Sequence, residues 1–278
     1  MNNKITNTMS NNNEAACDSI MLGADAMDYR QSRVMIGLSG GINSMAVLCW
    51  LANYENKPKD IYLFYAHFEE HSPDTLPFVV AGVEYARKHF DNVIFERTNN
   101  SVLELFKMMA MIPHPTIAPC TRLLKILPAV EFAAKHGCTI DLVGYVKTEM
   151  RRVKNMQSKG ADDLFLSKQF PIIEMSNEDC FDVVKKEIGW YPGIYDLRDE
   201  KGKRLFTHNN CLPCKNMQLN DYKKVQKYFP QYWEKAEALA SELQKHWGRS
   251  KEDYYVSFGR KDYEVNFETQ ICDTCAVS

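Results

Sequence analysis

The chain has 278 residues, of which 45% are hydrophobic, and its 34 basic and 36 acidic side chains give a formal net charge of −2. This length and composition are sufficient for one sizeable hydrophobic core, and the charge excludes a strongly basic nucleic-acid-binding protein, although not a local basic face. No apolar run approaches the roughly 20 residues that cross a bilayer, and no charged region followed by an apolar block indicates a signal peptide, so we expect a cytoplasmic protein with no membrane partner.

The first residues are rich in Asn, Ser and Thr and poor in large apolar side chains. Such a composition buries too little surface to order itself, so residues 1–28 are predicted to be a flexible arm. From residue 29 to 204, short apolar runs alternate with helix-length segments. The predicted strands cover residues 34–38, 61–68, 93–97 and 140–146, and the predicted helices cover 45–51, 73–88, 101–111 and 122–136. Strands separated by helices indicate βαβ units, so we predict an α/β fold with a doubly wound, mostly parallel sheet.

The pattern is less regular towards the C-terminus. Residues 171–186 are predicted to be a short extended piece followed by a helix, and residues 189–204 a loop. The remaining part, residues 205–278, is predicted to be a smaller Cys-rich helical segment packed on the sheet. It contains one or two helices within 220–247, interrupted at Pro230, and a hairpin within 252–267.

A short glycine turn follows the first predicted strand and opens the first predicted helix: Ser39-Gly40-Gly41-Ile42-Asn43-Ser44. Glycines allow the backbone to approach a ligand closely, and the unpaired N–H groups at a helix N-terminus attract anions. The turn therefore predicts a phosphate or sulfate site, although such a turn can also be a plain connection. It is neither a Walker loop nor a dinucleotide fingerprint, since no Gly-Lys-Ser/Thr follows and the glycine spacing differs.

Ligands of doubly wound sheets bind at the carboxyl ends of the strands. That edge collects residues 39–44, 67–70 and 145–152. An anion there also needs cations, which Arg122, Lys125, Arg151 and Arg152 can supply, with Glu149 orienting one of the arginines. The alternative is that residues 147–159 are only a solvated charged surface. His67, with Glu69, lines the adenosine side of the site or is an ordinary residue of the rim.

Several segments resemble one family. Residues 39–44 resemble the Ser-Gly-Gly-x-Asp-Ser signature of the PP-loop enzymes, and residues 120–128 resemble a Cys-(Cys/Thr)-x-x-x-Lys-(Val/Ile)-x-Pro segment. Residues 144–152 are similar to Gly-x-Arg-x-x-Glu-Ser-x-x-Arg. Residues 68–78, Pro171, Tyr195, Arg204 and Cys211-x-x-Cys214 continue the likeness. Residues 32–218 thus resemble the phosphoadenylylsulfate (PAPS) reductase-like family of the PP-loop (adenine nucleotide alpha hydrolase-like) superfamily, whose doubly wound fold is of the HUP type.

The resemblance implies an enzyme that acts at the phosphate or sulfate end of an adenine nucleotide. This nucleotide is ATP or an adenylyl sulfate of the PAPS/APS type, and Mg²⁺ is an optional further cofactor. It implies catalytic roles for Ser39, Asn43, Ser44 and Arg152. The nucleotide contacts that it implies come from Ser39, Gly40, Gly41, Asn43, Ser44, His67, Arg122, Lys125, Gly144, Arg151 and Arg152.

Three departures from the family pattern bear on the reaction. Asn43 replaces the signature's Asp, which removes a carboxylate that could hold Mg²⁺, and Val146 replaces an arginine. The chain also lacks the Glu-Cys-Gly-Leu/Ile-His ending that carries the reductase cysteine. The missing reductase ending favours ATP-dependent thiolation or adenylation of a second substrate, such as a nucleic acid with a sulfur-donor protein, over reductive sulfite release.

Nine cysteines in a cytoplasmic chain argue against a disulfide framework. Cys49, Cys138 and Cys180 lie in or beside apolar segments and are predicted to be structural, and Cys17 has no predicted role. Two Cys-x-x-Cys pairs indicate a metal site. The resemblance adds Cys120 and implies a [4Fe-4S] cluster, with zinc as the alternative and free thiols as the third possibility. The five candidate ligands are Cys120, Cys211, Cys214, Cys272 and Cys275.

Two rival interpretations remain open. Asn43 favours a nucleotide-binding module that has lost catalysis. The basic residues within 147–159 and 245–261 favour a metal-bound nucleic-acid adaptor. The oligomeric state, including whether the protein is an oligomer, does not follow from the sequence.

Overall fold

The computed structural model describes residues 27–111, 119–158 and 166–247. At its centre is a five-stranded sheet with the strand order β3-β2-β1-β4-β5, in which every neighbouring pair is parallel. The predicted α/β fold with a parallel sheet is confirmed. The strands are β1 (Val34–Gly37), β2 (Asp60–Phe68), β3 (Asn92–Asn100), β4 (Ile140–Leu142) and β5 (Ser167–Gln169).

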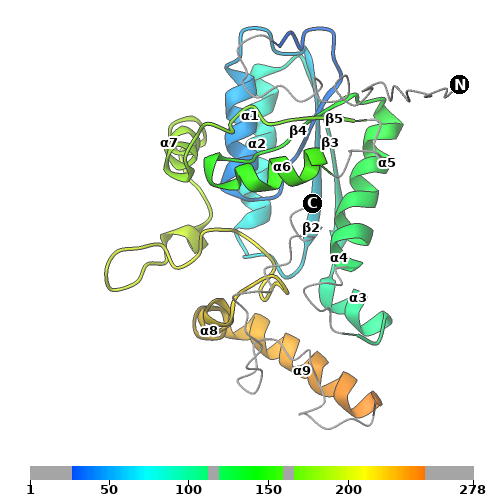
Figure 1. The fold of residues 1–278 in the computed structure, drawn as a ribbon, viewed down its shortest axis with the longest axis vertical. Helices are drawn as coiled ribbons and strands as arrows, with labels where there is room; N and C mark the ends of the chain where they lie inside the picture. Colours follow the sequence, from blue (N-terminus) through cyan, green and yellow to red (C-terminus); the bar gives the residue numbers. More distant parts are fainter. Residues whose placement is uncertain (1–26, 112–118, 159–165, 248–278) are drawn as a thin grey trace, which may run out of the picture.

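Helices cover both faces of this sheet (Figure 1). The α-helices are α1 (Ile42–Ala52), α2 (Thr75–His89), α3 (Val102–Met108), α4 (Pro119–Thr121), α5 (Leu127–His136), α6 (Met150–Ser158), α7 (Asn177–Ile188), α8 (Leu219–Tyr228) and α9 (Pro230–Trp247). Three short helices of other types are also present among the described residues. They are the π-helix η1 (Arg122–Ile126) and the 3₁₀ helices η2 (Lys147–Glu149) and η3 (Gly193–Asp196). None of the described helices is long and apolar enough to cross a membrane.

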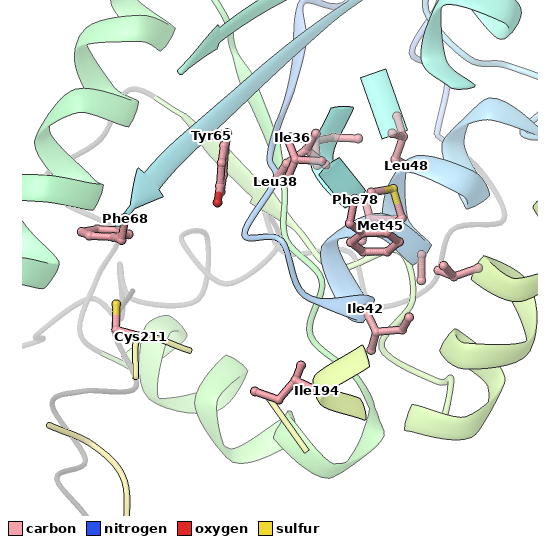
Figure 2. Packing of buried hydrophobic residues seen from close by; sticks show 14 of the residues in the cluster. Ile36, Leu38, Ile42, Met45, Leu48, Tyr65, Phe68, Phe78, Ile194 and Cys211 are labelled. Atoms are coloured by element: carbon pink, nitrogen blue, oxygen red, sulfur yellow. The ribbon is translucent and has the colours of Figure 1, made fainter. Parts of the chain in front are cut away.

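Alternate side chains of the central strands pack on opposite faces, as strand geometry requires. Val34, Ile36 and Leu38 join a large core with α1, α2 and α7, and Figure 2 shows Ile36 and Leu38 beside Met45 of α1. The intervening Met35 packs with Phe132 of α5 in a second core on the other face. Both faces are therefore buried, which explains why the first two strands are almost continuously apolar.

The direction in which successive strands are added to the sheet changes at β1. The connections through α1 and α2 lead outward to β2 and β3 on one side, whereas the connection that ends with α5 returns to β4 on the other side of β1. The carboxyl ends of β1 and β4 therefore flank a topological switch point, where doubly wound sheets bind their ligands.

The structure corrects several predicted boundaries. The helix after β1 begins at Ile42 rather than Met45, and β4 ends at Leu142 rather than Val146. The charged stretch after β4 folds into η2 and α6. The fifth strand, Ser167–Gln169, was not predicted, because three polar residues carry no strand pattern and owe their extended form to pairing with β4.

The C-terminal helices lie below the sheet in Figure 1, on the side where β2 ends. The chain reaches them along residues 206–218, where the backbone N–H of Leu212 donates to the carbonyl of Glu70, just after β2. The predicted interruption at Pro230 is confirmed, because Phe229 caps α8 and Pro230 begins α9. The predicted arm up to residue 26, the hairpin at 252–267 and the Cys272/Cys275 pair lie outside the described residues.

Candidate functional site

The Gly-Gly loop, residues 39–44, joins β1 to α1 at the switch point. Gly40 has φ +75°, in the left-handed region that favours glycine, and Gly41 is the extended N-cap of α1. The hydroxyl groups of Ser39 and Ser44 lie 3.0 Å apart. Ser44 Oγ accepts from the Ser39 N–H at 3.0 Å, and Ser39 Oγ accepts from the Gly41 N–H at 3.2 Å. The serines thus hold the loop closed by local hydrogen bonds.

Several N–H groups at this helix N-terminus remain available to a ligand. No residue within 27–111, 119–158 or 166–247 accepts a hydrogen bond from the N–H of Gly40, Asn43 or Ser44. The helix dipole adds partial positive charge at the same point, and the first turn of α1 contains no acidic residue. The local structure therefore suits an anion.

One N–H at the start of α1 is taken by a protein side chain instead. The hydroxyl of Tyr195, in η3, accepts from the Ile42 N–H at 3.3 Å. Tyr195 is 1% exposed, and its burial raises the pKa of the phenol to about 12, so it stays neutral. The residue was part of the family resemblance but was not among the predicted site residues. Tyr195 thus occupies one of the N–H donors at the start of α1.

A buried polar network supports the loop from behind. A Cβ atom at Gly40 would lie 2.2 Å from the Cγ2 of Thr75, the first residue of α2. The loop backbone therefore packs directly against that helix. The side-chain amide of Asn209 donates to the Gly40 carbonyl at 2.9 Å and to Thr75 Oγ1 at 2.8 Å. Sequence reasoning missed Asn209, since it is 169 residues from Gly40 and belongs to no motif.

The segment after β4 forms the wall opposite that network. A Cβ atom at Gly144 would lie 2.8 Å from the backbone of Asn43, so glycine at 144 permits this close approach. Beyond it, Glu149 Oε2 lies 3.5 Å from the side-chain nitrogen of Asn43, and Glu149 Oε1 accepts from Arg152 Nη1 at 2.5 Å. The Arg152 guanidinium also lies 5.9 Å from the centre of the Tyr145 ring. Glu149 thus orients Arg152 beside the loop.

The other predicted cations are not all at the loop. Arg151 is exposed on α6, next to Arg152. Arg122 and Lys125 lie on η1, and among the described residues no hydrogen bond or ion pair joins either of them to residues 39–44. The Lys125 ammonium lies 5.2 Å from the centre of the Phe68 ring, at the end of β2. The predicted cations therefore form two groups, one at the loop and one near the cysteines.

His67 belongs to a small polar cluster at the end of β2. The Tyr65 hydroxyl lies 3.1 Å from His67 Nδ1 and 3.0 Å from His71 Nδ1. Burial, together with the Arg97 guanidinium, lowers the pKa of His67. Burial, together with Lys125 and His67, lowers the pKa of His71 to about 3. Both histidines are therefore neutral at physiological pH, and they can donate or accept a hydrogen bond but add no positive charge to the site.

Three of the predicted metal ligands come from two distant segments. Cys120 lies in α4, whereas Cys211 and Cys214 lie between η3 and α8, and Figure 2 shows Cys211 below Phe68 at the end of β2. Burial raises the pKa of Cys120 and of Cys211, and the electrostatic effect of the nearby Cys214 raises both pKa values as well. The two buried thiols are therefore protonated at neutral pH. Cys49, Cys138 and Cys180 are buried elsewhere in the cores.

The chemistry of these three thiols suits iron or zinc, but their placement does not by itself form a metal site. Among the described residues, no group of three or more His, Cys, Asp or Glu side chains is close enough to hold a metal ion. Cys272 and Cys275 lie outside those residues. The [4Fe-4S] cluster and its zinc alternative stay predictions.

Comparisons with known proteins add little to this description. No family model and no curated protein matches the chain. Among solved structures, U34-tRNA thiolase NcsA from Methanococcus maripaludis with its [4Fe-4S] cluster is 12% identical, with a TM-score of 0.42, over 79% of this chain and 75% of that chain. NMN synthetase from Francisella tularensis is 12% identical, with a TM-score of 0.42, over 76% of this chain and 89% of that chain.

Proposed function

We propose that this protein is an enzyme that binds an adenine nucleotide, with the phosphate or sulfate end of the nucleotide on the Gly-Gly loop. One observation carries the proposal. The N–H groups of Gly40, Asn43 and Ser44, which have no acceptor among the described residues, lie at the start of α1, at the switch point of the sheet. Such N–H groups and the helix dipole bind anions in water-poor sites. The resemblance of residues 39–44 to the PP-loop signature supports a nucleotide as the source of the anion.

Arg152 is the residue that we assign to charge stabilisation. Its guanidinium is held by Glu149, which is itself next to Asn43 of the loop. A fixed cation costs less reorganisation when charge develops in the transition state. Ser39 and Ser44 shape the loop through their hydroxyl pair, and Gly144 allows the opposite wall to approach.

The reaction that we favour is adenylation of a second substrate. An oxygen nucleophile of that substrate attacks the α-phosphorus of ATP, the bond from this phosphorus to the bridging oxygen of the β-phosphate breaks, and pyrophosphate leaves while the nucleophile's proton passes to solvent. Thiolation would follow when a sulfur donor displaces AMP.

A nucleic acid is the acceptor that we favour, because exposed cations lie beside the loop. Lys147 in η2 and Lys154 in α6 are both exposed and flank the Glu149–Arg152 pair. Phosphate contacts from such side chains make binding salt-dependent. Binding of RNA that weakens steeply between 50 and about 200 mM salt would support this acceptor, and no binding at low salt would exclude it.

The direct test is calorimetry with ATP and adenosine, followed by an assay for pyrophosphate release. We expect ATP to bind at least tenfold more tightly than adenosine, since the loop contacts only the phosphate end. Equal affinity for the two, or no binding of either, would contradict the proposal. ATP binding without pyrophosphate release, in the presence of RNA acceptors, would instead favour the rival interpretation that Asn43 marks a catalytically inactive nucleotide-binding module.

A further inference from the structure

We propose that Asn209 is a positioning residue of the anion site. Its side-chain amide holds the Gly40–Gly41 peptide in the orientation that keeps the Gly40 carbonyl away from a bound phosphate or sulfate. The inference rests on the proposed function and names a residue that no motif of the sequence indicates.

Both polar groups of the Asn209 side chain, the amide nitrogen and the amide oxygen, make hydrogen bonds in the network that supports the loop. The residue is 6% exposed. Its Nδ2 donates to the Gly40 carbonyl at 2.9 Å and to Thr75 Oγ1 at 2.8 Å, and its Oδ1 accepts from Ser72 Oγ at 3.3 Å. Ser72 Oγ in turn lies 2.9 Å from Thr75 Oγ1. The loop carbonyl is therefore tied to the N-terminal end of α2.

Tyr195 is a second residue, distant in sequence, that holds the same loop. Its hydroxyl accepts from the Ile42 N–H at 3.3 Å. Asn209 binds the carbonyl of Gly40, whereas Tyr195 binds the N–H two residues further along the chain. The two contacts therefore hold the loop on either side of Gly41.

The peptide that Asn209 holds is one that can flip easily. It joins two glycines, which tolerate positive and negative φ about equally, and Gly40 already has φ +75°. In a trans peptide the C=O and the N–H point in opposite directions. Because Asn209 binds the Gly40 carbonyl, the Gly41 N–H points the other way, to Ser39 Oγ at 3.2 Å. A flipped peptide would direct the carbonyl oxygen towards the Ser39 hydroxyl and would change the dipole of the loop that we assign to the anion.

The consequence is specific to the anionic end of the ligand. A carbonyl dipole directed at a phosphate repels it, whereas an adenosine without phosphate is indifferent to this peptide. Among the described residues, Asn209 is the one partner of the Gly40 carbonyl, so its loss frees the peptide to flip. A purely structural role would weaken the binding of ATP and adenosine together.

The test compares these two ligands by calorimetry on the full-length chain. Asn209→Leu has nearly the same shape but no donor, and Asn209→Asp keeps the acceptor for Ser72 but loses the donor. We expect both variants to raise the Kd for ATP at least about tenfold and to change the Kd for adenosine less than about twofold. Asn210→Asp, the same change at the next, half-buried residue, is the control and should bind ATP like the wild type.

The outcomes separate this role from the proposed function. Wild-type affinity for ATP in Asn209→Leu, or equal losses for ATP and adenosine in both variants, would overturn the role of Asn209 while the proposed function stands. No ATP binding by the wild type would overturn the proposed function and this role with it. Melting temperatures of all variants show whether each protein is folded at the titration temperature, and Asn209→Asp replaces Asn209→Leu if the latter does not fold.

Discussion

The side-chain amide of Asn43 faces the carboxylate of Glu149, with 3.5 Å between Asn43 Nδ2 and Glu149 Oε2. Residues 39–44 resemble a signature with Asp at this position, and the contact shows what the asparagine binds in this chain. An amide nitrogen can face a carboxylate, whereas an aspartate at the same position would bring two negative charges together. The oxygen of the same amide, Asn43 Oδ1, is buried and accepts no hydrogen bond from the described residues.

The first prediction concerns Asn43→Asp. The new carboxylate repels Glu149, so we expect the variant to lose about 1–2 kcal/mol of unfolding free energy at pH 8 and to recover it at pH 5, where carboxylates begin to bind protons. Mg²⁺ at millimolar concentration should also restore stability at pH 8, because two carboxylates can share a hard cation. Urea unfolding at both pH values measures the effect. Asn99→Asp, at an exposed position on β3, is the control. The same loss at pH 5 and pH 8 would contradict the prediction.

The second prediction concerns Arg152→Met. Its partner Glu149 is mostly buried, with 13% of the side chain exposed, whereas the Arg152 side chain is 43% exposed. We expect less than about 1 kcal/mol of lost stability, since a partly exposed ion pair is screened, but at least a tenfold rise in the Kd for ATP. Calorimetry and thermal unfolding measure the two effects. Lys154→Met removes the same charge from the same helix and should leave ATP affinity within about twofold. An equal weakening in both variants would mean that only net charge matters.

The third prediction concerns Gly40→Ala. The substitution places a Cβ atom against Thr75 Cγ2 and forces alanine to a φ of +75°, so we expect a loss of about 2–4 kcal/mol. Thr75→Ser removes the clashing methyl group and keeps the hydroxyl that Asn209 binds. In that background Gly40→Ala should cost about 1–2 kcal/mol less. Urea unfolding of the four proteins gives the coupling energy, and a cost that is independent of residue 75 would show that the contact does not matter.

The fourth prediction concerns the stability of the protein in acid. Burial lowers the pKa of His71 to about 3, from about 6.5 in the unfolded chain, so the unfolded state binds a proton that the folded state does not. The stability contributed by neutral His71 is full above pH 6.5 and is lost as the pH falls towards 3, with a slope of up to about 1.4 kcal/mol per pH unit. His71→Asn should reduce this slope between pH 6.5 and 4. Urea unfolding across that range measures it, and parallel curves for variant and wild type would refute the assignment.

The fifth prediction concerns the cysteines. Protein purified without oxygen should contain iron and acid-labile sulfide in equal amounts, and Cys211→Ser should lose both. Cys138→Ser changes a thiol in the core beside α5 and should retain them. Metal analysis and the visible spectrum distinguish the alternatives. Zinc in a colourless protein would replace the cluster by a zinc site on the two Cys-x-x-Cys pairs, and a protein without metal would mean that these cysteines are free thiols.

The sequence by itself determined the parts of this protein that depend on neighbouring residues. The apolar runs of β1 and β2, the glycine turn after β1 and the break at Pro230 are local patterns, and each predicts its structure through backbone sterics or burial. The order of strands and helices then places residues 39–44 at the carboxyl edge, because parallel βαβ units connect in one hand. The fold class and the position of the loop follow from this.

Only the tertiary structure decided which distant side chains complete the site. The polar strand β5 exists because β4 pairs with it, and no local pattern indicates it. Asn209 meets Gly40, and Tyr195 meets Ile42, across 169 and 153 residues of chain. The structure also places Lys125 over Phe68 and Arg152 against Glu149 beside the loop, and no pattern within either segment indicates these contacts. Such contacts depend on packing between elements, and the sequence pattern within each element contains no information about them.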